Sequence, residues 1–215
     1  ADGPGHRAMN PAVTLEVAAP GAYASLQDAG RRGYRRIGVP WAGVLDARLM
    51  RIANALADNA DGAPAIECFD GGLHLVARGG TLRLAVAGDA VLHIERAGER
   101  QVLDAWRSLT LADGEALRVS RVTRGRIVVV AVEGLVLPQV LGSASTYARA
   151  ALGGVDGRAL AAGMQWAVPA ASPSAERMLP VPPLDASGPI RAVPGPQAAH
   201  FDDRVRAAFV NADYQ

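Results

Sequence analysis

Short alternating runs of apolar and polar residues fill the first two thirds of the chain. Residues 13–17 read Val-Thr-Leu-Glu-Val, the alternation expected of a half-buried strand. Between residues 65 and 132 similar runs occur at 73–76, 82–86, 91–94, 108–111, 116–119 and 127–132. The turn signals between them are Gly79-Gly80, Gly88-Asp89, Ala97-Gly98, Asp113-Gly114 and Arg124-Gly125. Strands this short and closely spaced predict an antiparallel or mixed barrel or sandwich, not a doubly wound sheet.

One segment of the first half has helical periodicity instead. Its apolar residues recur on one face, at Leu49, Ile52, Ala53 and Leu56. Asp46 precedes them and is expected to cap the helix, with a catalytic role as the alternative. The pattern ends at Asn59 and Gly62.

The composition changes after residue 141, where glycines and hydroxyl residues replace the apolar runs. We expect a tag or disordered terminus at residues 1–12 and a β-barrel domain at 13–168. A proline-rich extended linker is expected at 169–189. Beyond it, a short strand at 190–193 and a helix at about 201–210 predict the start of a truncated second domain at 190–215.

Composition narrows the chemistry. The 22 Lys and Arg residues are all arginine, which excludes a Schiff-base lysine, a Walker-type lysine and a biotinylated lysine on this chain. A net charge of +1 gives no general attraction to nucleic acid or lipid. The 4 histidines are scattered, so no metal site is predicted. A single cysteine, Cys68, and the lack of a long apolar run favour a cytoplasmic protein without a membrane span.

Several local patterns, taken in order, resemble one family. The segment SLQDAGRRGYRRIGVPWAGVLD, residues 25–46, is similar to the opening motif of the bacterial 5-oxoprolinase C subunits and the urea amidolyase carboxyltransferase domains. This family also includes allophanate hydrolase subunit 2. Further matching patterns are Ala53-Asn54, Asp58-Asn59, Pro64-Ala65-Ile66-Glu67, Gly72, Ala87-Gly88, Trp106-Arg107, Leu141-Gly142-Ser143, Ser145-Thr146, Gly157-Arg158 and Pro194-Gly195-Pro196.

The resemblance implies a mainly β fold made of two cyclophilin-like β-barrels with a few short helices. The second barrel would begin near the C-terminus of this sequence. The implied function is that of a subunit of an ATP-dependent complex that opens 5-oxoproline to L-glutamate. Its partners would be an inhibitor-like B subunit and an A subunit, with ATP shared among the subunits.

Two other functions remain open under the same resemblance. One is a biotin-dependent carboxyltransferase of the urea amidolyase type, with the biotin carried on a partner. The other is a non-catalytic regulatory partner of an inhibitor-type subunit. This last function is favoured by the missing second half and by departures from the family pattern at Val129, Ile127, Glu133-Gly134 and Met164.

The first group of candidate site residues lies on a glycine-hinged loop: Gln27, Asp28, Arg31 and Tyr34. Arg31 offers a planar fork suited to a carboxylate or phosphate. In the functional interpretation Asp28 orients Arg31 and takes part in catalysis. The alternative is a structural Asp28–Arg31 bridge that pins the loop.

Glu67 is the second catalytic candidate, because a carboxylate inside an apolar strand needs either an arginine partner or a raised pKa. Asn54, next to the apolar stripe of the predicted helix, either satisfies a loop carbonyl or faces the site. The hydroxyl-rich stretch with Ser143, Ser145 and Thr146 could bind an oxyanion or phosphate, or could cap the segment that follows. Arg158 is a second candidate anion ligand.

Overall fold

The computed structural model describes residues 12–180 and 188–213. The chain divides into two compact units, Ala1–Val181 and Pro182–Gln215, and each is described by itself. The tag or disordered terminus predicted for residues 1–12 lies outside the described residues except for Ala12, as do residues 181–187 of the predicted linker.

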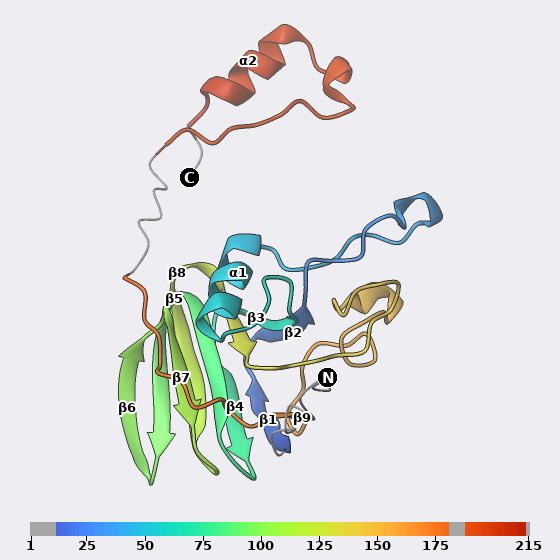
Figure 1. The fold of residues 1–215 in the computed structure, drawn as a ribbon. Helices are drawn as coiled ribbons and strands as arrows, with labels where there is room; N and C mark the ends of the chain where they lie inside the picture. The colour runs from blue at the N-terminus through green and yellow to red at the C-terminus, as the bar shows by residue number, and fades with distance from the viewer. Residues whose placement is uncertain (1–11, 181–187, 214–215) are drawn as a thin grey trace, which may run out of the picture. The chain divides into compact units, whose positions relative to one another are not determined.

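The first unit is built on one curled antiparallel sheet (Figure 1). Its strands are β1 Ala12–Pro20, β2 Tyr23–Gln27, β3 Ala65–Phe69, β4 Leu73–Arg78, β5 Leu82–Arg96, β6 Glu99–Asp104, β7 Arg107–Leu111, β8 Ala116–Val132 and β9 Gln165–Pro169. The order is β2-β3-β8-β4-β1-β9, and β5 pairs with β6, β7 and β8. This confirms the mainly β fold with a barrel-like sheet.

The long strand β8 explains the curl. Its second half pairs with β3, from Ile127 to Ala131, and its first half pairs with β4, from Ala116 to Val119. Along its other edge it pairs with β5. One strand therefore joins two parts of the sheet, and apolar side chains such as Leu84, Leu117 and Val130 are fully buried there.

Two glycine-containing pairs that the sequence analysis assigned to turns lie inside strands. The runs predicted at 82–86 and 91–94 are one strand, β5, and those at 116–119 and 127–132 are one strand, β8. Asp89 is paired with Arg124, and the register shifts on both sides of Asp89. A Cβ on Gly88 would lie 2.7 Å from Val128 Cγ1. Here glycine permits a bulge and close strand contact, and not a chain reversal.

Other elements differ in smaller ways. Strands β2, β6 and β9 were not predicted. Strand β6 has a mostly exposed sequence without alternation, and only its pairing with β5 identifies it. The strand predicted at 190–193 is absent from the described second unit, whose regular elements are η3 Ala198–His200 and α2 Asp203–Asn211. The predicted helix at about 201–210 is confirmed as α2.

The predicted first helix is confirmed as α1 Ala47–Leu56. The Asp46 carboxylate accepts hydrogen bonds from the N–H groups of Arg48 and Leu49, so Asp46 is the expected N-cap. Leu49 and Leu56 are buried, and the helix packs on β5, β7 and β8. Two short 3₁₀ helices, η1 Arg35–Ile37 and η2 Ala148–Ala150, lie in loops. Among the described helices, none has the length and apolarity that crossing a bilayer requires.

The start of the predicted linker is bonded to the sheet. The guanidinium of Arg83, 4% exposed, donates to the carbonyls of Ser172, Ser174 and Ala175 and to the Ser174 hydroxyl. Backbone hydrogen bonds then tie this segment to β7, since Ser108 N–H donates to Arg177 O over 2.8 Å. We call residues 170–179 the strap.

Replacing Arg83 by methionine tests what holds the strap. The change removes the donor of three strap carbonyls and leaves the Glu133 carboxylate, 14% exposed, without the guanidinium that lies 3.7 Å from it. We therefore expect a loss of about 2–4 kcal/mol in unfolding free energy. Urea denaturation followed by circular dichroism measures it. Arg78→Met is the matched control, because Arg78 is half exposed and its one ion pair among the described residues is with Glu16. Equal effects of the two substitutions would contradict the assignment.

Candidate functional site

Most of the buried polar side chains of the first unit gather where β2 ends and residues 140–146 pass beside it. We call this group the polar cluster. Each member is at most 7% exposed, and the members are Ser25, Gln27, Asp28, Arg31, Ser143, Ser145 and Thr146. The structure therefore brings together six residues that the sequence analysis selected in two separate segments, and adds Ser25.

Asp28 is the centre of the polar cluster. Its Oδ1 accepts hydrogen bonds from the hydroxyls of Ser143 and Ser145, at 2.6 and 2.5 Å, and from Gly30 N–H at 2.8 Å. Its Oδ2 accepts from Ala144 N–H at 2.6 Å. The Asp28 N–H in turn donates to Ser145 Oγ at 2.9 Å. The two segments are thus joined through one carboxylate.

These bonds determine the protonation state of Asp28. Burial by itself would raise the pKa of the Asp28 carboxyl, but the hydrogen bonds it accepts outweigh burial and hold the pKa below its usual range. A carboxylate stabilised in this way is a poor proton acceptor. The catalytic role of Asp28 stays a prediction, and its surroundings are those of a structural anchor.

Arg31 also binds the neighbouring loop and not Asp28. Its Nη2 donates to Ser145 O, and its Nε donates to Val140 O at 3.4 Å. No ion pair joins Arg31 to Asp28 within the described residues. The predicted Asp28–Arg31 bridge is therefore wrong, and so is the expectation that Asp28 orients Arg31: each residue holds the 140–146 loop separately.

Three buried atoms of the polar cluster have no hydrogen-bond partner in the described part of the chain. They are Gln27 Oε1, Arg31 Nη1 and Thr146 Oγ1. An unpaired buried polar atom costs about 1–3 kcal/mol. An acceptor, a charged donor and a hydroxyl in one cluster suit a small ligand that carries both N–H and oxygen groups.

Glycines close the polar cluster from the side of residues 153–154. A Cβ on Gly153 would lie 2.5 Å from Arg31 Nη2, and one on Gly154 would lie 2.1 Å from Thr146 Oγ1. Both residues have positive φ. The loop backbone thus lies directly on the cluster, so a ligand could reach these atoms only if the loop moved.

Glu67 lies beside the polar cluster on β3. It is paired with Ser25 of β2 in the antiparallel register, and Ser25 Oγ accepts from Gln27 Nε2 at 2.9 Å. Glu67 is 5% exposed and its Oε2 accepts from Leu45 N–H at 2.6 Å. Burial raises the pKa of the Glu67 carboxyl, and the Leu45 N–H offsets this only in part. The sequence predicted either an arginine partner for Glu67 or a raised pKa. Among the described residues no arginine pairs with Glu67, and its pKa is raised.

The remaining candidates lie outside the polar cluster. The Asn54 amide donates to Ala63 O at 2.9 Å and accepts from Asn59 Nδ2 at 3.1 Å, so it satisfies a loop carbonyl. Tyr34 precedes η1 in an exposed loop. Arg158 is exposed to solvent. Their predicted binding roles stay predictions.

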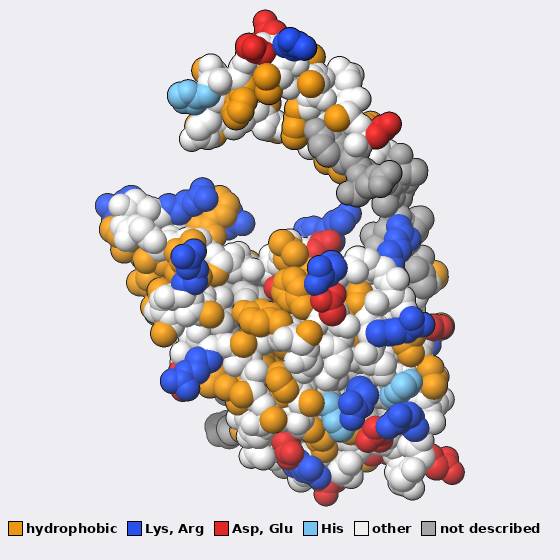
Figure 2. Space-filling model, turned by 180° about the vertical axis from the view of Figure 1, so that it is seen from behind, with side chains coloured by type: hydrophobic (Ala, Val, Ile, Leu, Met, Phe, Trp, Pro, Cys, Tyr) orange, Lys and Arg blue, Asp and Glu red, His pale blue; other side chains and the backbone are white. Residues whose placement is uncertain are grey.

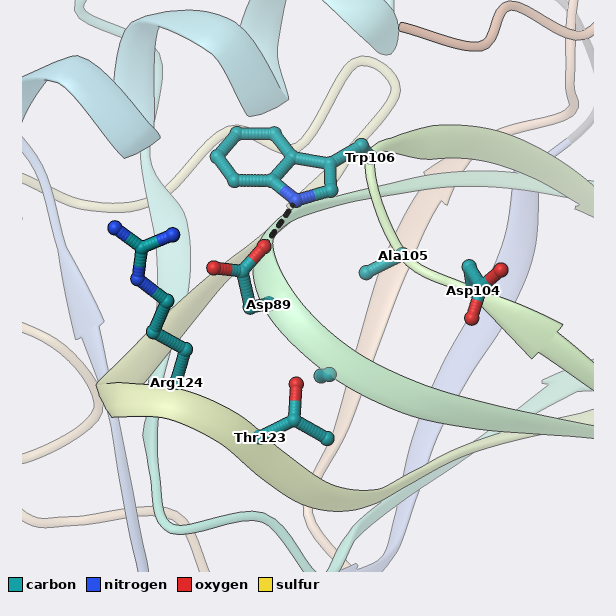
Figure 3. Close-up of a pocket in the computed structure, with 7 residues that line it drawn as sticks. Asp89, Asp104, Ala105, Trp106, Thr123 and Arg124 are labelled. Carbon is teal, nitrogen blue, oxygen red and sulfur yellow. Dashed lines mark hydrogen bonds between the residues drawn. The ribbon is translucent and has the colours of Figure 1, made fainter. Parts of the chain in front are cut away.

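Ser25 and a hollow lined by β5, the β6–β7 turn and β8 were not predicted from the sequence. Alternation along β2 could have indicated Ser25, because it is two residues before Gln27 on the same strand face. The hollow, of about 250 Å³, is lined by Asp89, Ala90, Asp104, Ala105, Trp106, Thr123 and Arg124 (Figure 3). Trp106 Nε1 donates to Asp89 Oδ1 over 2.7 Å. No group of His, Cys, Asp and Glu suited to a metal ion occurs among the described residues.

Comparison with known proteins gives consistent matches. The model of the family "Carboxyltransferase domain, subdomain A and B" matches residues 37–215. The C subunit of Escherichia coli 5-oxoprolinase is 32% identical over 203 residues, which are 94% of this chain and 64% of that protein. The C subunit of Haemophilus influenzae 5-oxoprolinase is 37% identical over 66% of this chain and 45% of its own length. This chain therefore spans less than two thirds of these curated relatives.

Solved structures agree. One crystal structure of TTHA0988 matches with a TM-score of 0.74 and 31% identity over 92% of this chain and 41% of that chain. The urea amidolyase of Kluyveromyces lactis matches with a TM-score of 0.65 and 31% identity over 81% of this chain and 10% of that chain. The family resemblance found in the sequence is confirmed.

Asp28→Asn tests the anchor. Asparagine cannot accept the same set of bonds, so we expect a loss of about 2–3 kcal/mol in unfolding free energy at neutral pH. Since the folded pKa of Asp28 lies below its unfolded value, the wild-type advantage is present above about pH 4 and is lost as pH falls through the folded pKa. Urea denaturation across this range measures it; a pH-independent difference would contradict the anchor.

Glu67→Gln has the opposite pH dependence. A carboxyl whose folded pKa is raised makes the wild type lose stability as pH rises from about 4.3, the unfolded value, through the folded pKa. Glutamine does not ionise and can still accept from Leu45 N–H. We therefore expect the variant to gain stability relative to wild type over that window, and not below it. Thermal unfolding at several pH values measures the gain. Its absence would show that burial does not raise the pKa of Glu67.

Proposed function

The chain belongs to the carboxyltransferase-domain family with subdomains A and B, and from this membership we propose that it works as part of a 5-oxoprolinase-type complex. The observation that carries the proposal is its 32% identity to the E. coli 5-oxoprolinase C subunit over 94% of its length. In the proposed reaction the lactam of 5-oxoproline opens to L-glutamate, coupled to hydrolysis of ATP. The other members of the complex are an inhibitor-like B subunit and an A subunit.

Opening a lactam requires activation of a poorly electrophilic amide and delivery of a proton to the departing nitrogen. ATP would supply a phosphoryl group for the activation. The polar cluster does not fit a triphosphate, because the chain has no lysine and the arginine and hydroxyls of the cluster are internal. We therefore propose that the partner subunits hold most of the ATP.

Glu67 suits the proton delivery. A buried carboxyl with a raised pKa keeps its proton closer to neutral pH, as a general acid must. The unpaired Gln27 Oε1 and Arg31 Nη1 lie in the polar cluster next to its strand. With the loop of residues 153–154 moved aside, the first could accept a lactam N–H, and the second could donate to the substrate's carboxylate.

A biotin-dependent carboxyltransferase is the second candidate. The family description and the urea amidolyase of Saccharomyces cerevisiae, 33% identical over 70% of this chain, favour it. Because this chain contains no lysine, the biotin would be carried by a partner. The proton-transfer role of Glu67 would then apply to a urea-like amide in place of the lactam.

Reconstitution with the two partner subunits tests the proposal. We expect glutamate release that requires both ATP and 5-oxoproline. Glu67→Gln should lower turnover about 10²–10⁴-fold, the usual contribution of a general acid, with the complex still assembled. Glu99→Gln, at an exposed position on β6, is the control and should keep full activity. Carboxylation of urea with a biotinylated partner, in place of glutamate release, would establish the second candidate instead.

A further inference from the structure

A loop between β2 and α1 extends from the sheet as an arm (Figure 1). We call residues 29–45 the arginine arm. Its base is closed by backbone hydrogen bonds, from Val44 N–H to Asp28 O at 3.0 Å and from Arg31 N–H to Trp41 O at 2.8 Å. Gly30 has φ +83°, and a Cβ there would lie 2.8 Å from Trp41 O. The base of the arm therefore has a defined backbone conformation, fixed by hydrogen bonds and close packing.

The arm carries strong, uncompensated positive charge. Arg32, Arg35 and Arg36 are exposed, and residues 29–45 contain no Asp or Glu. None of the three forms an ion pair with any residue that the structure describes. The guanidinium carbons of Arg32 and Arg35 lie 4.8 and 4.7 Å from the centroid of the Trp41 ring. Stacking on the ring orients two charges without neutralising them.

Large apolar side chains are exposed on the same arm. Ile37 is 65% exposed, Trp41 42% and Leu45 72%. At the arm's base the partly exposed Val140 lies close by, because its carbonyl accepts from Arg31 Nε. Figure 2 shows arginine and hydrophobic side chains together on the arm, at the upper left of the first unit. An exposed tryptophan among arginines has the composition of an interface hot spot.

The charge and the apolar groups together identify the kind of partner. Exposed isoleucine and leucine favour a protein surface over a nucleic acid, whose backbone offers mainly phosphates, and the net charge of +1 gives no broader basic field. A second copy of the arm is disfavoured, since a two-fold contact would place arginines against arginines with no carboxylate between them. A partner surface rich in Asp and Glu around an apolar centre would complement the arm.

We propose that the arginine arm is the docking element through which this chain binds a carboxylate-rich surface on another subunit of its complex. The identity of that partner rests on the proposed function. A partner bound to the arm would also be close to the candidate acid, because the last residue of the arm, Leu45, donates its N–H to Glu67. The same contact that recruits the partner would thus fix the backbone around the catalytic carboxyl.

The test compares two charge-reversed variants that change net charge equally. Arg32→Glu/Arg35→Glu/Arg36→Glu alters the arm, and Arg51→Glu/Arg121→Glu/Arg149→Glu alters exposed arginines elsewhere. Binding to the purified A and B partner subunits is measured by biolayer interferometry at several salt concentrations, with circular dichroism to check folding. We expect at least tenfold weaker binding for the arm variant, little change for the control, and wild-type binding that weakens with salt. Trp41→Ala should also weaken binding.

The other outcomes are distinct. Equal binding of the arm and control variants to a partner would overturn the arm's role and leave the proposed complex intact. Failure of the wild type to bind either subunit would overturn the proposed complex and this docking role together. Wild-type binding to duplex DNA, or dimerisation in light scattering, that is lost only in the arm variant would assign the arm to nucleic acid or to a second copy.

Discussion

The buried carboxylate of Asp28 accepts hydrogen bonds from two distant parts of the chain, the start of the arginine arm at Gly30 and the loop from Ser143 to Ser145. A buried charge is tolerated only when its acceptor capacity is used. The 143–145 loop and the arm both donate hydrogen bonds to the two carboxylate oxygens of Asp28, directly after the end of β2. These bonds hold the three segments together, and Arg31 and the other polar side chains are positioned by the segments.

Thr146, in the same loop, and Leu160, further along the chain, together cover an edge of the sheet. Strand β2 pairs with β3 on one side, and on its other side Thr146 N–H and Leu160 N–H donate to the carbonyls of Leu26 and Ala24. An uncovered edge would offer these carbonyls to another chain. The contacts that assemble the candidate site therefore complete the sheet, so a change in Asp28 affects stability and site geometry together.

Sequence patterns predicted those elements whose formation depends on residues close together in the chain. The cap at Asp46 and the apolar face of α1 depend on residues within one or two turns, and both were found. Bulges were missed, because whether Gly88 turns the chain or lets it pass close to Val128 depends on a strand far along the sequence. For the same reason the partner of Arg31 was predicted wrongly. Asp28 is near it in sequence, but the carbonyls that bind Arg31 belong to Val140 and Ser145.

Neighbouring arginines show how position decides function in this loop. Arg31 is 1% exposed and satisfies loop carbonyls, whereas Arg32, the next residue, is exposed and stacked on Trp41. Removing a buried charge from water is costly unless fixed acceptors replace the lost hydration, so Arg31 is committed to holding the loop. The exposed arginines of the arm form no ion pair with any described residue, so their charge can bind a partner. One glycine-hinged segment thus supplies both an internal clamp for the candidate site and an external charge for a partner, and the Leu45–Glu67 hydrogen bond connects the two.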